Sequence, residues 1–215
     1  SETAASGTVT FTRTGGSADG GPHVQALSGT ELNSGAHNDI TLTNDPTLVD
    51  GAIYTIEFDA TDAAGNAATP VSNTGITYDV TTTAPTLATP AENSIDNGTL
   101  AIDFTLPEAA SSGTVKMTFT RTGGVNDANA PHIITFNSNF ETAAQHTNDL
   151  DGSDLGANAN VSSVDTNPND ALVDGAIYSV KIEYQDEAGN TAASVTNTNF
   201  TYDLTTAAPA LATPA

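Results

Sequence analysis

The residues best suited to chemistry in this sequence are an Asp and an Asn within a five-residue stretch that occurs twice. The stretch reads DAAGN from Asp62 to Asn66 and DEAGN from Asp186 to Asn190. Each copy offers two side-chain oxygens around a glycine that is free to adopt positive φ, and Ca²⁺ takes roughly six to eight oxygen ligands. Gly and Asn are equally the residues of a tight hairpin turn that an Asp caps. The pattern therefore leaves two interpretations open, a calcium ligand loop and an ordinary turn.

Further aspartates lie where they could complete such a site. Asp79 and Asp203 each end a predicted last strand, just before TTTAP and TTAAP. The sequence predicts Ca²⁺ near the junction at residues 79–96, and a second site after the repeated copy. The first would draw on Asp62, Asn66, Asp79 or Asp96, and the second on Asp186, Asn190 and Asp203. For Asp79 and Asp203, an ordinary solvated strand end is the alternative.

A third acidic group lies in the stretch NDLDGSDLG, where Asp149, Asp151 and Asp154 surround Gly152. It matches only half of a calcium loop, because no bidentate Glu follows at the required distance. A solvated acidic loop is therefore the favoured interpretation here, and metal binding is the alternative.

Other chemically capable residues fit structural roles better. The four histidines recur in pairs, without a cysteine or a second histidine at zinc spacing; they are His23, His37, His132 and His146. Strand or loop positions are predicted for them. Arg13 and Arg121 occupy matching places at strand ends, and a structural ion pair with a nearby carboxylate is predicted for each.

Catalytic constellations are missing from the sequence. There is no Ser/His/Asp order attached to a strained turn, no Gly-rich phosphate loop and no cysteine nucleophile. The carboxylates are spread over predicted wet faces rather than paired for acid–base work. A non-enzymatic protein is predicted.

Composition restricts the partners. The 215 residues include 26 acidic and four basic ones, for a net charge of −22. Such a surface repels phosphate backbones and anionic lipid, which argues against nucleic acid and membrane surfaces and favours cations. No run approaches the ~20 apolar residues of a membrane helix. An acidic, lysine-poor surface is also typical of salty surroundings, which alone would explain the charge.

A long internal repeat organises these features. FTRTGG recurs at an offset of 108 residues, Pro22-His23 at 109, and LVDGAIY at 124. The second copy therefore carries 15 more residues (124 − 109), placed by this alignment between His146 and Leu172. That segment is rich in Gly, Asn and Asp, which predicts a loop near 147–171. An alignment of LSGTEL with LDGSDL would place the insertion earlier.

Each copy reads as strand after strand, with no helical period of useful length. Apolar residues alternate with threonine and acidic residues, typical of antiparallel sheets with one wet face. Strands are predicted in these stretches: 8–14, 24–27, 40–42, 52–60, 76–78, 99–106, 115–119 and 176–184. DGAIY, at Asp50–Tyr54 and Asp174–Tyr178, has the spacing of a tyrosine corner, with Ile56 and Val180 as the core residues that follow. The predicted fold is all-β, as two tandem β-sandwiches.

The frame FTRTGG…PH…GTEL…GAH…LVDGAIYTIEFDATDAAGN…TYD…TAP resembles the bacterial immunoglobulin-like repeats of giant surface adhesins and related extracellular proteins. The resemblance covers essentially the whole chain. It implies immunoglobulin-like sandwiches, secretion, an array whose domains act as spacers, and Ca²⁺ at domain junctions in several such families. Expected partners are neighbouring repeats of the same chain or other copies of the protein, outside the cell at its surface.

The phase of the repeat predicts the domains. Residues 1–83 form a sandwich without its first strand, 84–207 form a complete one, and 208–215 lead into a further repeat, because LATPA repeats there. TLAIDFTL, which begins at Thr99, is the strand that the first copy does not show, and an upstream stretch or a neighbouring copy is expected to supply it.

Three function classes remain. The first is a spacer of an adhesin-like array, and the second is a building block of an extracellular filament or sheath. The third, an accessory module for an enzyme or a glycan binder, needs exposed aromatics, and the chain has no Trp and five Tyr.

Overall fold

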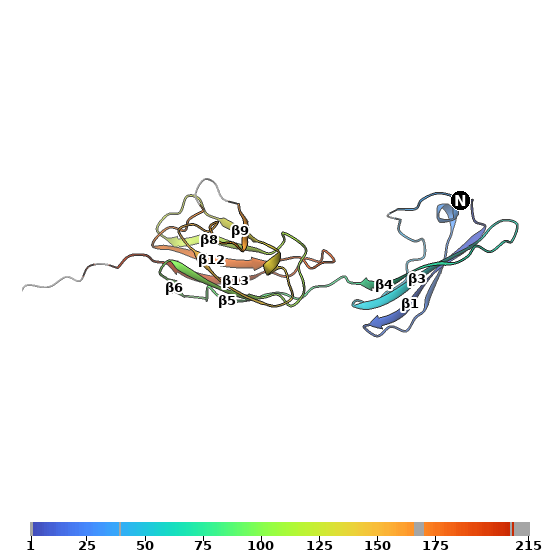
Figure 1. The fold of residues 1–215 in the computed structure, drawn as a ribbon, viewed down its shortest axis with the longest axis horizontal. Coiled ribbons are helices and arrows are strands. Elements are labelled where there is room, and N and C mark those ends of the chain that lie inside the picture. Colours follow the sequence, from blue (N-terminus) through green and yellow to red (C-terminus); the bar gives the residue numbers. More distant parts are fainter. Residues whose placement is uncertain (1, 39, 166–169, 207, 209–215) are drawn as a thin grey trace, which may run out of the picture. The chain divides into compact units, whose positions relative to one another are not determined.

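The chain forms two compact units, each with its own sheets (Figure 1). The computed structural model describes residues 2–38, 40–165, 170–206 and 208. Unit 1 is Ser1–Val80 and unit 2 is Thr81–Ala215, so the division falls three residues before the one expected after residue 83. Of the predicted linker 208–215, all but residue 208 lies outside the described residues.

The fold is all-β, as the period-two patterns predict. Within the described ranges, the helical elements are two short 3-10 turns, Gly29–Leu32 and Ser138–Phe140, and no α-helix occurs there. None of the helices in this part of the chain is long and apolar enough to cross a membrane.

The described residues of unit 1 form one antiparallel sheet in the order β2-β1-β3-β4. Its strands are β1 (Ser6–Gly16), β2 (His23–Ala26), β3 (Ala52–Thr61) and β4 (Val71–Tyr78). The buried hydrophobic residues among those described are Phe11, Ala52 and Tyr54, with partly buried neighbours such as Val9 and Ile56 around them. One face of this sheet therefore carries a small core.

Unit 2 has two sheets that enclose one large core, a sandwich-like arrangement. The smaller sheet has the order β10-β7-β5 and the larger one β11-β9-β8-β12-β13-β6. The strands are β5 (Thr86–Thr89), β6 (Ile95–Asp96), β7 (Thr99–Thr105), β8 (Lys116–Gly124), β9 (His132–Phe136), β10 (Gln145–Asp151), β11 (Val161–Val164), β12 (Ala176–Glu183) and β13 (Val195–Tyr202). Phe104 of the smaller sheet and Phe119 and Val180 of the larger one are fully buried in the same core.

The alternation that predicted the strands also sets their inner faces. Along β12, Tyr178, Val180 and Ile182 are buried and the residues between them are half-exposed. This is the expected pattern of a strand with one face on the core. The inward positions predicted from AIYSVKIEY are therefore confirmed.

Two local predictions are wrong. Residues 40–42, predicted as a strand, form none. The segment 147–171, predicted as a loop, contains most of β10 and all of β11, although 166–169 lie outside the described residues. In both cases the available partner decides the outcome, because a strand persists only where a neighbouring strand takes its hydrogen bonds. β10 has β7 beside it, paired from Gln145↔Thr105 to Asp151↔Thr99.

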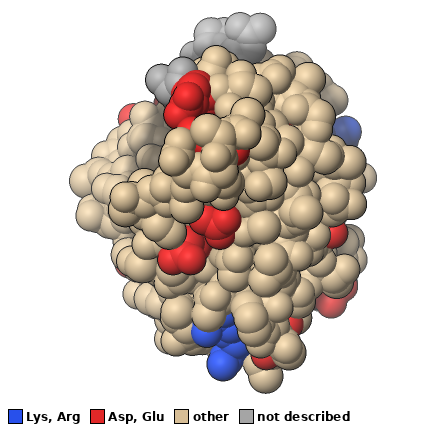
Figure 2. All heavy atoms as spheres, turned by 90° about the vertical axis from the view of Figure 1, so that its right-hand side faces the viewer, with Lys and Arg blue, Asp and Glu red and all other residues tan. Residues whose placement is uncertain are grey.

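Charge is sparse and mostly negative on the surface. Figure 2 shows one face, largely uncharged, on which acidic side chains are more prominent than basic ones. This agrees with a composition in which only 14% of residues are charged and acidic ones dominate.

Candidate functional site

The tyrosine corner is present in unit 2 and holds a buried polar group. The Tyr178 hydroxyl accepts a hydrogen bond from the backbone N–H of Val173 at 2.9 Å. It also donates to Oδ2 of Asp127 at 2.7 Å. The first contact joins the start of β12 to the preceding corner, so the predicted tyrosine corner is confirmed.

Asp127 extends the corner into a chain of three side chains. His132 Nε2 lies 2.7 Å from Asp127 Oδ2, and the exposed fractions of the two side chains are 0% and 1%. The backbone N–H of Asn129 donates to the other carboxylate oxygen at 3.0 Å. Because an ionised carboxylate only accepts, His132 donates from Nε2. Tyr178, Asp127 and His132 are called the corner triad of unit 2 below.

Unit 1 contains the same arrangement in a wetter setting. Tyr54 accepts from the Val49 N–H at 3.0 Å and donates to Asp19 Oδ2 at 2.6 Å. His23 Nε2 lies 2.7 Å from the same oxygen, and its side chain is 24% exposed. The corner triad of unit 1 is thus Tyr54, Asp19 and His23.

The electrostatics of the corner triads favour a fixed protonation state. Burial opposes ionisation of Asp127, but the hydrogen bonds from His132 and Tyr178 outweigh it, and the pKa of Asp127 is lowered. Burial, and then the carboxylate of Asp127, raise the pKa of Tyr178. At neutral pH the carboxylate is therefore charged and the phenol protonated. A pair held so far from neutral pH suits a structural link better than proton transfer.

The arginines support the neighbouring turns, which corrects the prediction of ion pairs. Arg121 donates from Nε to the carbonyl of Val125 and from Nη2 to that of Gly124, both at 2.8 Å. Arg13 makes the same two bonds to Ser17 and Gly16. The cause is local, since Gly124 has a φ of 67° that only glycine adopts readily, and the turn presents carbonyls to the guanidinium.

The DAAGN stretch is a turn closed by its own aspartate. Asp62 Oδ1 accepts from the backbone N–H groups of Ala64 and Asn66, each at 2.8 Å. Its Oδ2 accepts from Asn66 Nδ2 at 2.8 Å, and Gly65 has a φ of 87°. These bonds, led by the one from the Asn66 side chain, lower the pKa of Asp62. The geometry is that of the turn interpretation.

DEAGN repeats this turn in a buried setting. Asp186 accepts from the Asn190 backbone N–H at 2.8 Å and from Asn190 Nδ2 at 2.9 Å. Asp186 is 2% exposed, and its carbonyl accepts from the Ser111 hydroxyl at 2.7 Å. The second copy therefore also anchors the segment before β8.

The predicted metal ligands fall at opposite ends of the strands. Asp62 and Asn66 follow the end of β3, whereas Asp79 follows β4 beside the start of β3, where Ala52 pairs with Tyr78. A ten-residue strand is ~33 Å long, so one ion cannot reach both ends. In unit 2, Asp186 and Asn190 are separated from Asp203 in the same way, because Ala176 pairs with Tyr202.

Three of the predicted ligands, Asp96, Asp151 and Asp203, lie on segments that come together at the end of unit 2 where β13 finishes. Tyr202 pairs with Asp96, Asp203 follows it, and Asp151 pairs with Thr99 at the start of β7. Asp149 and Asp154 lie close by along the chain, and the backbones of Asp154 and Asp151 form an isolated antiparallel β-bridge. This set is called the acidic end of unit 2 below. Among the described residues, no group of three or more His, Cys, Asp or Glu side chains has the geometry to hold a metal ion.

One hydroxyl at the acidic end is unsatisfied. The Tyr202 hydroxyl is buried and has no hydrogen-bond partner within the described structure. Burial, followed by the charges of Asp151, Asp96 and Asp174, raises the pKa of Tyr202. The phenol thus stays protonated beside several carboxylates.

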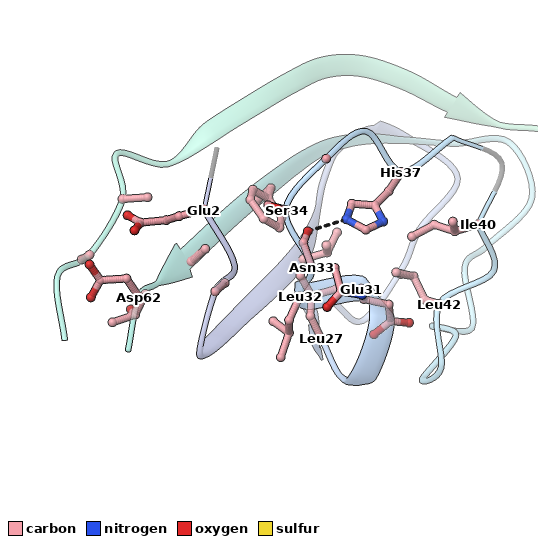
Figure 3. A pocket seen from close by; sticks show the side chains of 18 of the residues that line it. Glu2, Leu27, Glu31, Leu32, Asn33, Ser34, His37, Ile40, Leu42 and Asp62 are labelled. Atoms are coloured by element: carbon pink, nitrogen blue, oxygen red, sulfur yellow. Dashed lines mark hydrogen bonds between the residues drawn. The ribbon is translucent and has the colours of Figure 1, made fainter. Parts of the chain in front are cut away.

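Unit 1 carries a groove over the apolar face of its sheet (Figure 3). It has a volume of about 510 Å³, and its apolar lining includes Val9, Leu27, Ile40, Leu42 and Phe58. It is called the open groove below.

Comparison with protein-family models, with characterised proteins and with solved structures finds no significant match to this chain. Function is therefore inferred from the geometry of the chain itself.

Sequence reasoning missed the two aspartates at the centre of the corner triads, Asp19 and Asp127. A signal for them exists. Each precedes the repeated Pro-His pair by three or four residues, at Asp19 before Pro22 and at Asp127 before Pro131.

Proposed function

We propose that the chain is a non-enzymatic structural module, two tandem immunoglobulin-like units of which the second is a sandwich, and that it acts as a spacer in a bacterial extracellular surface protein. One observation carries the proposal: the polar residues that occur in both copies are engaged in holding corners and turns. The corner triads, the arginine-supported turns and the two DxAGN turns direct their hydrogen-bonding groups to neighbouring parts of the same unit. Nothing in such an arrangement favours turnover.

The experiment examines shape and activity together. A spacer is expected to remain monomeric and to give individual particles of uniform length in electron micrographs at all concentrations. It is also expected to show no hydrolase turnover on ester, peptide and glycoside substrates. Measurable turnover that is lost in Asp127→Asn would contradict the proposal.

The alternative function is a building block of a filament or sheath. The open groove favours it, because an uncovered apolar face and unpaired strand edges promote contacts between chains. Regular polymers in micrographs of the purified chain would favour this alternative over the spacer.

A further inference from the structure

Unit 1 reproduces only part of unit 2. Its strands β2, β1, β3 and β4 match β9, β8, β12 and β13 in sequence and in order within the sheet. The strands β5, β6 and β7 of unit 2 have no counterpart among the described residues of unit 1. One face of the unit 1 sheet is therefore without the layer that covers it in unit 2.

The side chains on that face record the difference. Phe58 stands where Ile182 stands in the second copy, 124 residues later. Phe58 is 39% exposed, whereas Ile182 is 0% exposed. Val9 is partly buried, whereas Met117, at the matching place in β8, is 0% exposed. The same frame thus has a dry inner face in unit 2 and a partly wet one in unit 1.

The backbone conformation of the two units differs at the same place. Residues 36–42 match β10 at the offset of 109. Both segments begin alike, since His37 Nε2 lies 2.8 Å from the Asn33 carbonyl and His146 Nε2 lies 2.8 Å from that of Thr142. In unit 2 the chain then pairs with β7 over seven residues, whereas the described residues of 36–42 join no strand. The described residues of this segment therefore lack the partner strand that β10 has in β7.

The open groove lies on the sheet face that strands β5, β6 and β7 would cover if unit 1 had counterparts of them. Its lining combines inward residues of β1 and β3 with apolar side chains of the segment that begins at Leu27. Figure 3 shows Ile40, Leu42 and His37 on the chain that borders it, and the dashed bond from His37 to Asn33 holds that chain. The groove is thus bounded by a sheet face and by a chain whose described residues join no strand.

We propose that the open groove of unit 1 binds an extended peptide segment with the sequence pattern of residues 84–106. In that pattern Leu100, Ile102, Phe104 and Leu106 alternate with small or polar residues, and unit 2 shows what the pattern does, since all four are 0–1% exposed over the matching sheet face. Main-chain pairing with residues 36–42 would add the bonds of an inserted strand, and the alternating side chains would fill the groove. This goes beyond a spacer role, because it makes unit 1 an acceptor.

The occupant is a separate segment and not residues 84–106 of a second copy. In this chain those residues cover the core of unit 2, where Leu100 and Phe104 are 0% exposed. Lending them to another molecule would expose the apolar side chains of that core to water, which is unfavourable. A free or fused segment of the same pattern carries no such cost.

The test adds a synthetic peptide of residues 84–106 to the full chain and follows hydrogen exchange. At ten times the Kd, exchange in residues 36–42 and in β1 and β3 is expected to slow about tenfold. A control peptide with serine at the four alternating positions should leave exchange unchanged. Equal exchange with both peptides would overturn the proposal.

Two matched variants locate the site. Phe58→Ser lies in the open groove and should weaken peptide binding at least about tenfold. Val24→Ser, at a 58% exposed position of β2 that pairs with Thr10 on the opposite face of the sheet, should leave it unchanged. Equal effects of the two substitutions would contradict binding in the groove.

A fused version guards against poor peptide solubility. Residues 84–106 are joined directly before Ser1, because the alignment of SETAASGTV with PEAASSGTV matches Ser1 to Pro107 in sequence. The bond from the Ala4 N–H to the Leu32 carbonyl, which matches that from Ala110 to Glu141, agrees with this alignment. The fusion should protect the same amides and remain monomeric. No protection, or dimers in which the unfused chain exchanges residues 84–106, would overturn the proposal. These outcomes are independent of the micrographs and turnover assays that test the spacer function.

Discussion

Asp127 is a carboxylate with 1% of its side chain exposed, held by three donors from different parts of unit 2. The tyrosine donor could be predicted from DGAIY, because the spacing within one corner is local. The carboxylate could not, because it lies 51 residues from Tyr178 and only the sheet order brings the two together. The arginine bonds were missed for a related reason, since the backbone carbonyls at a positive-φ turn leave little trace in residue type.

Removing one donor from this carboxylate tests its structural role. Tyr178→Phe deletes the bonds to Asp127 and to the Val173 N–H, and leaves both groups buried without that partner. We expect the free energy of unfolding of unit 2 to fall by about 1–3 kcal/mol, measured by urea denaturation. Tyr54→Phe is the matched variant. Its effect on unit 1 should be smaller, because His23 is 24% exposed and water can reach that corner triad. Equal losses in the two units would contradict this account.

The corner triad also predicts how stability depends on pH. The pKa of Asp127 is lowered in the folded chain from its ordinary value of 3.8, so folding favours the ionised form. This contribution is fully present above pH 3.8 and is lost as the pH falls through the folded pKa. Denaturation measured between about pH 2 and pH 7 should show a fall in unit 2 stability on the acid side. In Asp127→Asn that fall should be shallower, and an unchanged acid profile would exclude Asp127 as its source.

At the scale of elements, alternating residues allowed a strand to be predicted from the sequence. The strand with which it pairs could not be predicted in this way. Residues 40–42 and 145–151 both alternate weakly, yet only the second forms a strand, because β7 lies beside it. The content of Gly, Asn and Asp in 147–171 predicted a loop, but pairing to β7 and β9 overrides that local preference. Turn and strand chemistry are local properties, whereas sheet membership depends on the rest of the unit.

The predicted calcium ligands also differ according to the element that carries them. The DxAGN turns use their aspartate oxygens internally, whereas at the acidic end of unit 2 the charges of Asp151, Asp96 and Asp174 act on the unsatisfied Tyr202 hydroxyl. Calcium binding stays a prediction, and we place it at this end, where a cation would offset the mutual repulsion of the carboxylates.

Calcium added to the EDTA-treated chain should raise the melting temperature of unit 2. At 100 times the Kd the gain is about 2.7 kcal/mol. Asp151→Asn should reduce this response. Asp186→Ala should lower the stability of unit 2, because it opens the DEAGN turn, while the shift on adding calcium stays the same. If neither calcium nor EDTA changes the melting temperature of unit 2, the calcium hypothesis is wrong.

For the molecule as a whole, the two units differ mainly in how much they bury. Among the described residues, the core of unit 2 contains 22 buried hydrophobic residues and that of unit 1 contains three. The sequence predicted an uncovered apolar row in the first copy, because a first strand was expected to be missing there. It could not show which side chains the gap exposes, because that depends on the register of β1 against β3.

Unequal cores predict unequal stability. Burying a large apolar side chain contributes about 1.5–3 kcal/mol, and unit 1 buries few of them, so its free energy of unfolding should be the smaller. Since the two cores are separate clusters, calorimetry of the full chain should show two transitions, with unit 1 melting first. Tyr54→Phe should lower only the first transition and Tyr178→Phe only the second. Hydrogen exchange run in parallel should show β1 and β3 opening at lower denaturant concentration than β8 and β12. A single transition that both substitutions shift equally would mean that the two units unfold cooperatively, and would contradict this prediction.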